Sequence, residues 1–433
     1  MLSARGPIPL HESPFWFENV PDSAPSSSPL PDRADVVVVG AGYTGLAAAR
    51  ELARAGASVA VLEEETVGYG ASSRNGGQVL TGLKLGAGEL VEAFGRQRAR
   101  ELYGASIEAI ERLERLIADE RIDCEYARSG HIEAAFTPAH FRALEREQEV
   151  LAAVFDREVH VIPRAGQRSE LGSDFYHGVL VDDRSGGLHP VKYVRGLAAA
   201  ATRAGAKVHE RTRATAIERR GTLFAVSTGR TGRIDAGAVL VATNAYTGRL
   251  VPALARRVVP IASSIIATEP LASDRAASVL PGRRMAFDTK NFVYYFRLSA
   301  DNRLLFGGRA EFRRSTPAAT RRSAEILRRG MVEVFPELAD VRVEYVWSGN
   351  VAFTRDFFPH VGRLDGVHYA MGYCGHGVAL ATRFGMAAAN LILGRDDPMP
   401  FVNLPFRPFP LYNGTPWFLP LAGAWYTLLD WVA

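Results

Sequence analysis

The strongest pattern along the chain is an unbroken run of β-branched residues over 36–39, followed by helical spacing over 46–55 and a second run over 58–62 that is apolar after Ser58. Such a run is typical of a strand that is buried on both faces of a parallel sheet. Gly56 follows the helical stretch, at the position where a helix C-terminus favours glycine. Residues 35–62 therefore predict a strand, a helix and a second, parallel strand.

Both patterns recur through the rest of the chain. Helical spacing of apolar residues predicts helices over 88–118, 138–154, 319–334 and 378–393. Apolar runs and period-two alternation predict strands over 223–227, 239–242, 292–297, 304–308 and 367–371. This mixture of elements predicts an α/β protein.

The two ends of the chain break these patterns. Seven prolines lie between Pro7 and Pro31, so residues 1–34 predict an extended Pro-rich arm rather than a helix or a central strand. We expect the aromatic residues 15–17 to anchor this arm on the body of the protein or to cover an active site. Residues 401–433 form an aromatic C-terminal tail.

Composition narrows the class of protein. The chain has 433 residues, 47% hydrophobic and 23% charged, as in a globular protein of two or three domains. Two cysteines, Cys124 and Cys374, exclude a disulfide scaffold and an all-cysteine metal site, and we expect a cytoplasmic compartment and no metal. The net charge of +4 comes from scattered arginines, so no nucleic-acid partner is expected. No apolar run is long enough to span a membrane, and the first residues lack a signal-peptide pattern.

Candidate chemistry begins at the turn after the first strand, where a GxGxxG pattern places glycines at 40, 42 and 45. The first glycine permits a tight turn, the second lets the backbone approach a pyrophosphate, and the third lets helix and strand pack closely. The helix N-terminus offers N–H groups and the positive end of its dipole to the phosphates. Glu63 ends the second strand, where a carboxylate accepts hydrogen bonds from the adenosine ribose and repels a 2′-phosphate. The pattern predicts a dinucleotide site that disfavours NADP.

Three further stretches, at 70–78, 241–246 and 372–378, combine glycines with small polar residues. The chain has no second GxGxxG motif of the kind that a second nucleotide-binding half would carry. This arrangement favours FAD over NAD as the dinucleotide.

In these stretches, above all in Ser-Ser-Arg-Asn-Gly-Gly-Gln at 72–78 and Gly-His-Gly-Val at 375–378, the chain resembles the D-amino-acid-oxidase-like family of FAD-dependent oxidoreductases. The family includes glycine oxidase and sarcosine oxidase, and the chain looks most like its gamma-glutamylputrescine oxidoreductase type. The resemblance implies a loop along the flavin ring at 72–77 and a helix N-terminus facing the flavin at 377. The residues that it implies for FAD binding are Gly40, Gly42, Tyr43, Thr44, Gly45, Glu63, Glu64, Ser72, Ser73, Arg74, Asn75, Gly76, Gly77, Gln78, Ala214, Ala242, Thr243, Asn244, Gly349, Gly375, His376, Gly377 and Val378.

The resemblance also implies how the chain divides into domains. We expect a Rossmann-type FAD-binding domain interleaved with a β-rich substrate domain that has a mixed antiparallel sheet plus helices. The expected boundaries are 35–105, 165–255 and 345–400 for the FAD-binding domain, and 106–164 and 256–344 for the substrate domain.

The chain departs from its relatives in ways that bear on cofactor and substrate. Covalent flavoproteins of the family have a cysteine shortly before a Thr-x-Asp element, which lies here at 354–356 with no cysteine in 348–351, so we expect non-covalent FAD. Carboxylate anchors of amino-acid-oxidising relatives are missing near 350–352 and 378–379. Unless Arg74, Arg297 or Arg309 replaces them, we expect an amine without an adjacent carboxylate. The lysine that promotes oxygen reduction in some relatives falls near Leu305 here.

The expected reaction is oxidation of a C–N bond in a primary or secondary amine, for instance one resembling gamma-glutamylputrescine, by hydride transfer to flavin N5. The imine then hydrolyses to an aldehyde, and O2 is reduced to H2O2. The residues expected to be catalytic are Arg74, Tyr294, Tyr295 and His376. The residues expected to line the substrate pocket are Tyr294, Tyr295, Arg297, Arg309, Phe353 and Tyr373.

Two alternatives stay open. An amino-acid or imino-acid dehydrogenase that feeds a membrane electron carrier is suggested by residues 416–433, which are apolar and aromatic but too short and Pro-interrupted to span a bilayer. This tail has a second interpretation, in which it packs on the protein's own surface or on a second copy. The other alternative is a catalytically silent flavoprotein that binds a partner.

Overall fold

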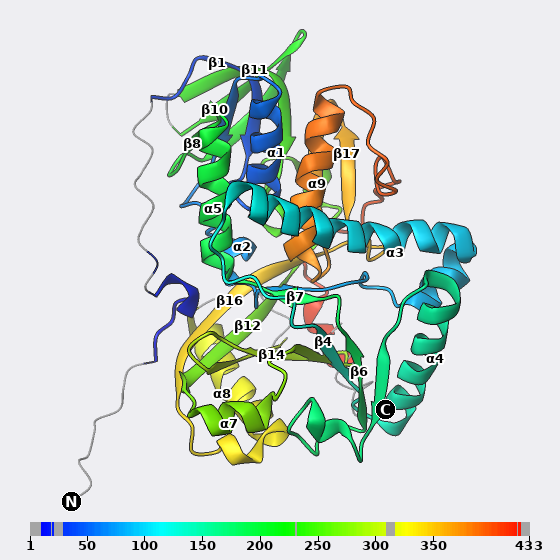
Figure 1. The fold of residues 1–433 in the computed structure, drawn as a ribbon. Coiled ribbons are helices and arrows are strands. Elements are labelled where there is room, and N and C mark those ends of the chain that lie inside the picture. The colour runs from blue at the N-terminus through cyan, green and yellow to red at the C-terminus, as the bar shows by residue number, and fades with distance from the viewer. Residues whose placement is uncertain are drawn as a thin grey trace, which may run out of the picture.

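The computed structural model describes residues 10–18, 20, 29–229, 232–308, 317–421 and 423–425. Within these residues, two eight-stranded sheets form the two halves of the molecule, one above the other in Figure 1. A short third sheet joins β3 (Gln78–Val79) to β7 (Gly186–Gly187). The predicted α/β class, with a Rossmann-type part and a β-rich part, is confirmed.

The upper sheet has the order β17-β18-β11-β1-β2-β8, and its central pairs are parallel. The antiparallel strands β9 and β10 extend it from β11. The first two strands and the helix between them are the predicted βαβ unit. The strands are β1 (Arg33–Val39), β2 (Val59–Leu62), β8 (Lys207–His209), β9 (Ala214–Arg220), β10 (Leu223–Thr228), β11 (Gly232–Val241), β17 (His360–Leu364) and β18 (Val367–Met371).

Both faces of this sheet are buried, which explains the unbroken apolar run in β1. Val36 and Val38 pack with α1 (Tyr43–Arg54), α5 (Pro190–Arg203) and α9 (Gly377–Ile392) on one face. Val37 and Val39 point to the other face and pack with apolar residues of β9, β10 and β11. Because β1 is packed on both faces, its C-terminal end, where the glycine turn begins, has a fixed position.

The lower sheet has the order β16-β12-β15-β14-β13-β4-β6-β5 and is antiparallel except where β4 pairs with β13. One face packs on α8 (Pro317–Val334) and on α7 (Ser273–Val279) through a large apolar cluster. The other face is turned toward the upper half. The strands are β4 (His131–Ala134), β5 (His160–Pro163), β6 (Gly178–Asp182), β12 (Val259–Pro270), β13 (Met285–Asp288), β14 (Tyr294–Leu298), β15 (Arg303–Gly308) and β16 (Val343–Phe353).

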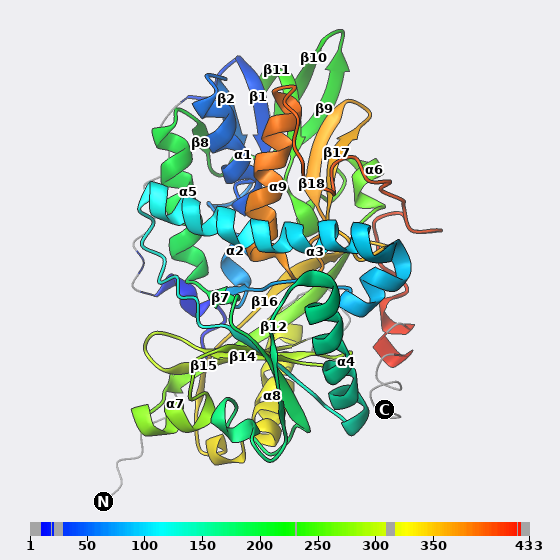
Figure 2. The same cartoon turned by 45° about the vertical axis from the view of Figure 1, so that its right-hand side comes forward.

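Two helices connect the halves. α3 (Ala87–Glu120) runs across the molecule between the two sheets, packs on α9, and meets α4 (Pro138–Phe155), as Figure 2 shows. The shorter helices α2 (Ala71–Arg74) and α6 (Pro252–Ala255), with the single turns η1 (Phe15–Phe17), η2 (Gln167–Ser169), η3 (Asn244–Tyr246) and η4 (Pro336–Leu338), complete the described elements.

The chain passes back and forth between the sheets, which makes domain boundaries hard to place from sequence. The predicted FAD-binding segments 165–255 and 345–400 contain β6 and most of β16, yet both strands pair within the lower sheet. The reason is that a buried apolar strand carries no local mark of the sheet it joins. The remaining predicted boundaries stay a prediction.

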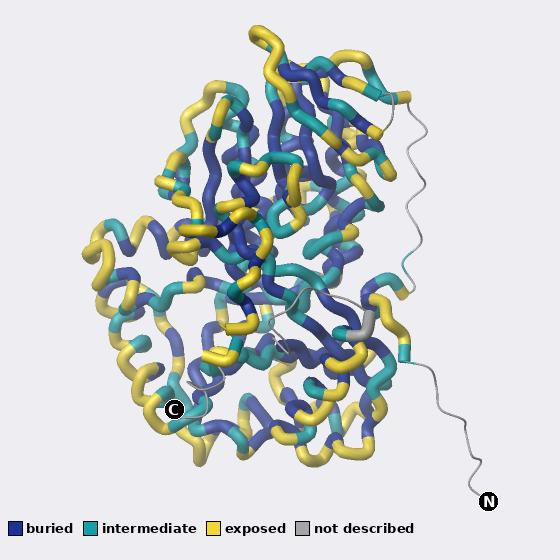
Figure 3. The backbone as a smooth tube through the Cα atoms, turned by 180° about the vertical axis from the view of Figure 1, so that it is seen from behind, coloured by how far each residue is buried: buried dark blue, intermediate teal, exposed yellow. Residues whose placement is uncertain are grey.

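Around Trp16, the described part of the N-terminal arm lies on the body of the protein. The ring of Trp16 in η1 is only 1% exposed and packs in a cluster with Ile265 and Trp347. In the burial view of Figure 3, the dark buried stretches run through the interiors of both halves. The prediction that aromatic residues anchor the arm is confirmed for Trp16.

The C-terminal tail packs on the protein in part. Tyr412 and Leu419 are buried against Val259 and Ile261, while Trp417 is 60% exposed. Residues 422 and 426–433 of the predicted tail lie outside the described residues. Within the described part of the chain, no helix is both long and apolar enough to cross a membrane.

Candidate functional site

Two cavities meet where the halves of the molecule face each other. One, of about 710 Å³, lies at the ends of β1, β2 and β11, and the other, of about 820 Å³, lies over the lower sheet. Seven residues line both cavities, so the two form one continuous space: Ala71, Asn75, Asn350, Val351, Cys374, Gly375 and Val378.

The glycine turn after β1 has the geometry that Gly40 and Gly45 were predicted to serve. Gly40 has a φ of +104°, in the region that favours glycine. A Cβ on Gly45 would lie 1.9 Å from the carbonyl oxygen of Gly40, so this position must lack a side chain for α1 to approach the strand. A Cβ on Gly42 would lie 2.8 Å from Ser72 Oγ. The N-terminus of α1 therefore opens onto the first cavity with bare backbone.

Glu63 lies at the end of β2 and lines the same cavity. Its carboxylate accepts hydrogen bonds from the backbone N–H groups of Ala41 (2.8 Å) and Glu65 (3.0 Å), which fixes it beside the glycine turn. Burial raises the pKa of this carboxyl above its usual range. A carboxylate held in this way is suited to accept hydrogen bonds from a ribose.

The loop that follows α2 is held in place by side chains from other elements that donate hydrogen bonds to its backbone carbonyls. Trp347 Nε1 donates to the carbonyl of Arg74 (3.0 Å), and Trp16 Nε1 donates to that of Asn75 (2.9 Å). The Arg297 guanidinium donates to the carbonyls of Gly76 (3.4 Å) and Gly77 (3.2 Å). Four consecutive carbonyls are therefore bound from the side of the arm and the lower sheet, and the loop has one defined shape.

The glycine-rich stretches at 241–246 and 372–378 are joined to each other by one hydrogen bond, and a second hydrogen bond joins 372–378 to α1. Asn244 Oδ1 accepts a hydrogen bond from the N–H of Gly372 (2.9 Å), and the Tyr373 hydroxyl lies 2.7 Å from Thr44 Oγ1. Gly375 has a φ of +101° in the turn that opens α9. The three stretches that the sequence places far apart thus lie side by side.

Most residues predicted to bind FAD line this space. The first cavity is lined by Gly40, Gly42, Tyr43, Thr44, Glu63, Glu64, Ser72, Ala214, Ala242, Thr243, Asn244 and Gly377, the second by Arg74, Gly76, Gln78, Gly349 and His376, and both by Asn75, Gly375 and Val378. Gly45, Ser73 and Gly77 line neither cavity. A bare glycine turn, a helix N-terminus and a carboxylate on one cavity fit the phosphates and ribose of FAD.

Comparison with known proteins decides the family. The model of the FAD dependent oxidoreductase family matches residues 35–391. Over 402 residues the chain is 35% identical to gamma-glutamylputrescine oxidoreductase from Escherichia coli K12, and 92% of each chain is covered. The chain belongs to the FAD dependent oxidoreductase family.

Other relatives of this oxidoreductase agree. A probable oxidoreductase, OrdL, from Rhizobium meliloti is 36% identical over 434 residues, with 98% of each chain covered. The crystal structure of glycine oxidase from Geobacillus kaustophilus has the same fold, with a TM-score of 0.72 and 23% identity over 86% of this chain and 99% of that one. The predicted family and enzyme class are confirmed.

The second cavity of the oxidoreductase has an aromatic and polar wall. Tyr295 and Phe353 line it, as predicted for the substrate pocket, and so do Arg74 and His376, which were predicted to be catalytic. The Tyr295 ring lies over Gly307, where a Cβ would come within 2.3 Å of the ring, and its hydroxyl lies 2.9 Å from Ser263 Oγ. Tyr373 lines the first cavity instead of the second, and Arg309 lies outside the described residues.

Tyr294 does not face the cavity, which corrects its predicted catalytic and pocket roles. Its ring packs on Phe306, and its hydroxyl lies next to Gly330 of α8, on the far side of the lower sheet. Successive side chains of a strand point to opposite faces, so Tyr294 and its neighbour Tyr295 cannot both line one cavity.

Arg297 does not line the cavity either. Its side chain is 9% exposed and is directed at the backbone of the loop at 76–77 and at the Leu188 carbonyl (2.9 Å). Burial lowers the pKa of this guanidinium to about 10. Its position indicates that it holds the loop at 74–77, called the flavin loop below after its predicted role, rather than the substrate.

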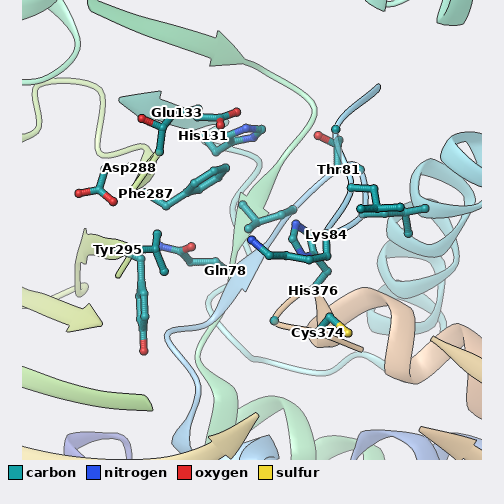
Figure 4. A pocket seen from close by; sticks show the side chains of 18 of the residues that line it. Gln78, Thr81, Lys84, His131, Glu133, Phe287, Asp288, Tyr295, Cys374 and His376 are labelled. Carbon is teal, nitrogen blue, oxygen red and sulfur yellow. The ribbon is translucent and has the colours of Figure 1, made fainter. Parts of the chain in front are cut away.

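His376 lies at the start of α9, and Figure 4 shows it beside Lys84 and Cys374 at one end of the second cavity. Burial lowers the pKa of its imidazole to about 4, so the ring is neutral at pH 7. Its Nδ1 is buried without a hydrogen-bond partner among the described residues. No group of three or more described His, Cys, Asp or Glu residues is placed to hold a metal ion.

The sequence interpretation missed Glu133, Lys84 and Phe287, which also line the second cavity. A signal for Glu133 is present in β4, where polar and apolar residues alternate as His131, Ile132, Glu133 and Ala134. Ile132 and Ala134 pack in the core below the sheet, so the two polar side chains face the cavity.

Proposed function

We propose that this oxidoreductase oxidises an amine whose reacting carbon carries no carboxylate, with O2 as electron acceptor. Gly40, Gly42 and Glu63 would help to hold FAD, and FAD would supply the redox chemistry: oxidation of the carbon next to the amine nitrogen, with transfer of two electrons to O2 to give H2O2. The imine product would hydrolyse in water to an aldehyde. The similarity to gamma-glutamylputrescine oxidoreductase supports an amine substrate.

One observation carries the proposal: the two described arginines that were candidates to anchor a substrate carboxylate both donate hydrogen bonds to backbone carbonyls instead. Arg297 donates to backbone carbonyls and does not line the cavity. Arg74 lines the cavity, but its Nε donates to the Tyr69 carbonyl (3.0 Å) and its Nη1 to the Ser348 carbonyl (3.2 Å). A buried substrate carboxylate needs charge-assisted hydrogen bonds, and neither arginine is placed to give both of them.

The walls of the cavity favour the reactive form of an amine. Hydride removal requires the free base, and an apolar surrounding disfavours the ammonium. Phe287, Tyr295 and Phe353 supply such walls, and the neutral ring of His376 adds no positive charge. These residues orient the amine and exclude water while the reaction takes place.

We infer that FAD is held without a covalent bond. Cys374 lines both cavities, but burial raises the pKa of its thiol to about 11, and its Sγ lies 3.5 Å from Thr354 Oγ1. A protonated thiol is a poor nucleophile. Both Cys124 and Cys374 are free and buried, which fits a reducing, cytoplasmic compartment.

The test is anaerobic titration of the yellow holoenzyme with polyamines, N-acylated diamines and α-amino acids, followed by its visible spectrum. We expect amines to bleach the flavin. Bleaching by α-amino acids alone would overturn the amine proposal, and failure of every compound would favour a silent flavoprotein. Acid precipitation of the same sample should leave the colour in solution, whereas a yellow pellet contradicts non-covalent binding.

A second candidate, oxidation of an amino acid or imino acid, is favoured by one observation. Lys84 reaches into the cavity beside His376 in Figure 4, where a cation is able to hold a carboxylate. In that case Lys84→Met raises KM for α-amino acids and leaves KM for simple amines unchanged.

A further inference from the structure

The floor of the second cavity is one row of side chains across the lower sheet. Glu133 of β4 is paired with Leu180 of β6 on one side and with Phe287 of β13 on the other, and Phe287 is paired with Tyr295 of β14. Paired residues share a face of the sheet, and all four line the cavity. The carboxylate of Glu133 therefore faces the same space as the Tyr295 ring.

Glu133 is half-buried, and the other buried or half-buried acidic groups that line the cavity already have partners within the protein. Asp182 binds Arg157 (2.7 Å), Asp288 lies 3.4 Å from Lys290 Nζ, and Glu147 accepts the N–H groups at the start of α3. Within the described part of the chain, the Glu133 carboxylate has no hydrogen-bond or ion-pair partner. A carboxylate in such a place is costly unless a ligand pairs with it.

The surroundings of Glu133 favour a positively charged ligand. Burial raises the pKa of its carboxyl to about 7; the negative charges of Glu147 and Asp288 add to this rise, and the positive charge of Lys84 opposes it. The Phe287 ring beside it, stacked on His131 at 5.3 Å, offers an aromatic face to a cation. Figure 4 shows Glu133, His131 and Asp288 together at the end of the cavity away from His376 and Cys374.

We propose that Glu133 binds a positively charged group of the substrate at a point remote from the oxidised carbon, so that the preferred substrate is a diamine-type amine with a second cationic centre. This rests on the proposed amine oxidation. Two strand spacings of about 4.8 Å separate Glu133 from Tyr295, so the second charge lies about 10 Å from the Tyr295 strand. Tyr295 in turn lies next to Gly76 of the flavin loop.

Other charges face this end of the cavity and share its electrostatics. The cations are Lys84, Arg146 and Lys290; the anions are Glu147, Asp182 and Asp288; and the histidines are His131, His140 and His376. Lys84 and Arg146 are exposed, and Lys290 lies over the Tyr294 ring at 3.4 Å. Substitution of Glu133 alone is therefore the clean test, because every other charge stays in place.

The experiment compares Glu133→Gln with Glu92→Gln in the holoenzyme. Glu92 is an exposed carboxylate at the rim of the same cavity, so it controls for the loss of one negative charge. Anaerobic flavin reduction is measured with a 1,4-diamine and with a monoamine of the same chain length. We expect Glu133→Gln to raise the apparent Kd for the diamine about 10- to 100-fold and that for the monoamine less than threefold, with the limiting rate of flavin reduction little changed. Equal effects on both amines would overturn the proposal.

Binding of a cation that the enzyme cannot oxidise tests the Glu133 site independently of the proposed amine oxidation. Tetramethylammonium has no oxidisable C–H bond next to an N–H, so it reports on the cation site through perturbation of the flavin spectrum. We expect it to bind more tightly as the pH rises from 6 to 8, because pairing needs ionised Glu133, and to lose this dependence in Glu133→Gln. Binding that is independent of pH, or equal in the variant, rejects the cation site. If no amine reduces the flavin, the proposed function fails, while this measurement still decides the cation site.

Discussion

Lys84 provides the cavity with a cation that the chain lacks at Leu305. Reduction of O2 places negative charge next to the flavin, and a nearby cation stabilises it. We expect Lys84→Met to slow reoxidation of the reduced enzyme by O2 about tenfold, while anaerobic reduction by an amine keeps its rate. Stopped-flow mixing with oxygenated buffer measures this step. Arg146→Met, at an exposed position on the same cavity, is the control, and an unchanged reoxidation rate in Lys84→Met would assign the step to another acceptor or residue.

Glu133 has a consequence for stability as well as for binding. Its pKa is about 7 in the folded protein and near 4.5 in the unfolded chain, so the folded state keeps a proton that the unfolded chain releases between these values. The stability that this group contributes is complete below pH 4.5 and is lost as the pH rises through 7. We expect Glu133→Gln to raise the free energy of unfolding by about 2 kcal/mol at pH 8 and to have little effect near pH 4. Urea unfolding at both pH values tests this. An equal effect at both pH values would show that packing, not charge, is responsible.

Glu133 also shows where sequence interpretation ends. The alternation of polar and apolar residues in β4 predicts that Glu133 faces away from the core. A four-residue strand does not reveal which residues face Glu133 across the cavity. Its neighbours in the cavity, Phe287 and Tyr295, are more than 150 positions away in the chain and are brought beside it by strand pairing. Tyr294 failed as a prediction for a related reason, because two adjacent aromatic residues cannot be assigned to faces until the core of the sheet is known.

The flavin loop is shaped by two other elements, η1 of the arm and β16. Trp16→Phe and Trp347→Phe keep a ring in place and remove one N–H donor each, which leaves the carbonyl of Asn75 or Arg74 without that partner. Such a loss costs about 1 kcal/mol. We expect each variant to lose FAD faster on dialysis and to shift the visible flavin spectrum. The matched control is Trp417→Phe in the tail, where the side chain is 60% exposed. If Trp16→Phe retains FAD as well as this control, the arm is only a tether.

Elements with strong local patterns were predicted closely, and those that depend on partners were not. Three predicted helices agree with α3, α4 and α9 within two residues at each end: those over 88–118, 138–154 and 378–393. They could be located because the 3.6-residue period of apolar positions is a local property of the sequence that needs no knowledge of distant partners. The assignment of β6 and β16 to a sheet depended on strands far away in the chain. The same holds for the site, since the glycine turn and Glu63 belong to one local βαβ unit, whereas the residues that line the second cavity come from several strands.

We expect FAD bound in the joined cavities to link the two halves of the molecule. Both sheets contribute to the joined cavities, and the chain crosses between the sheets repeatedly, so neither half is one continuous stretch of the described chain. Long α3 packs on α9 of the upper half and on α4 beside the lower sheet. A ligand in the shared cavity therefore stabilises the whole molecule and not one part of it.

Removal of FAD tests this linkage by calorimetry. At a FAD concentration a hundred times its Kd, binding adds about 2.7 kcal/mol, which for a chain of this length corresponds to about 3 °C in Tm. We expect holoenzyme and apoenzyme each to unfold in one transition, with the apoenzyme lower by about this amount, and addition of FAD to restore the higher Tm. Two transitions of which only one moves with FAD would show that the halves unfold independently. That outcome would also show that FAD binding does not stabilise the part of the second cavity formed by the lower sheet. Glu133 and Tyr295 belong to that sheet, whereas Glu63 lies at the end of a strand of the upper one.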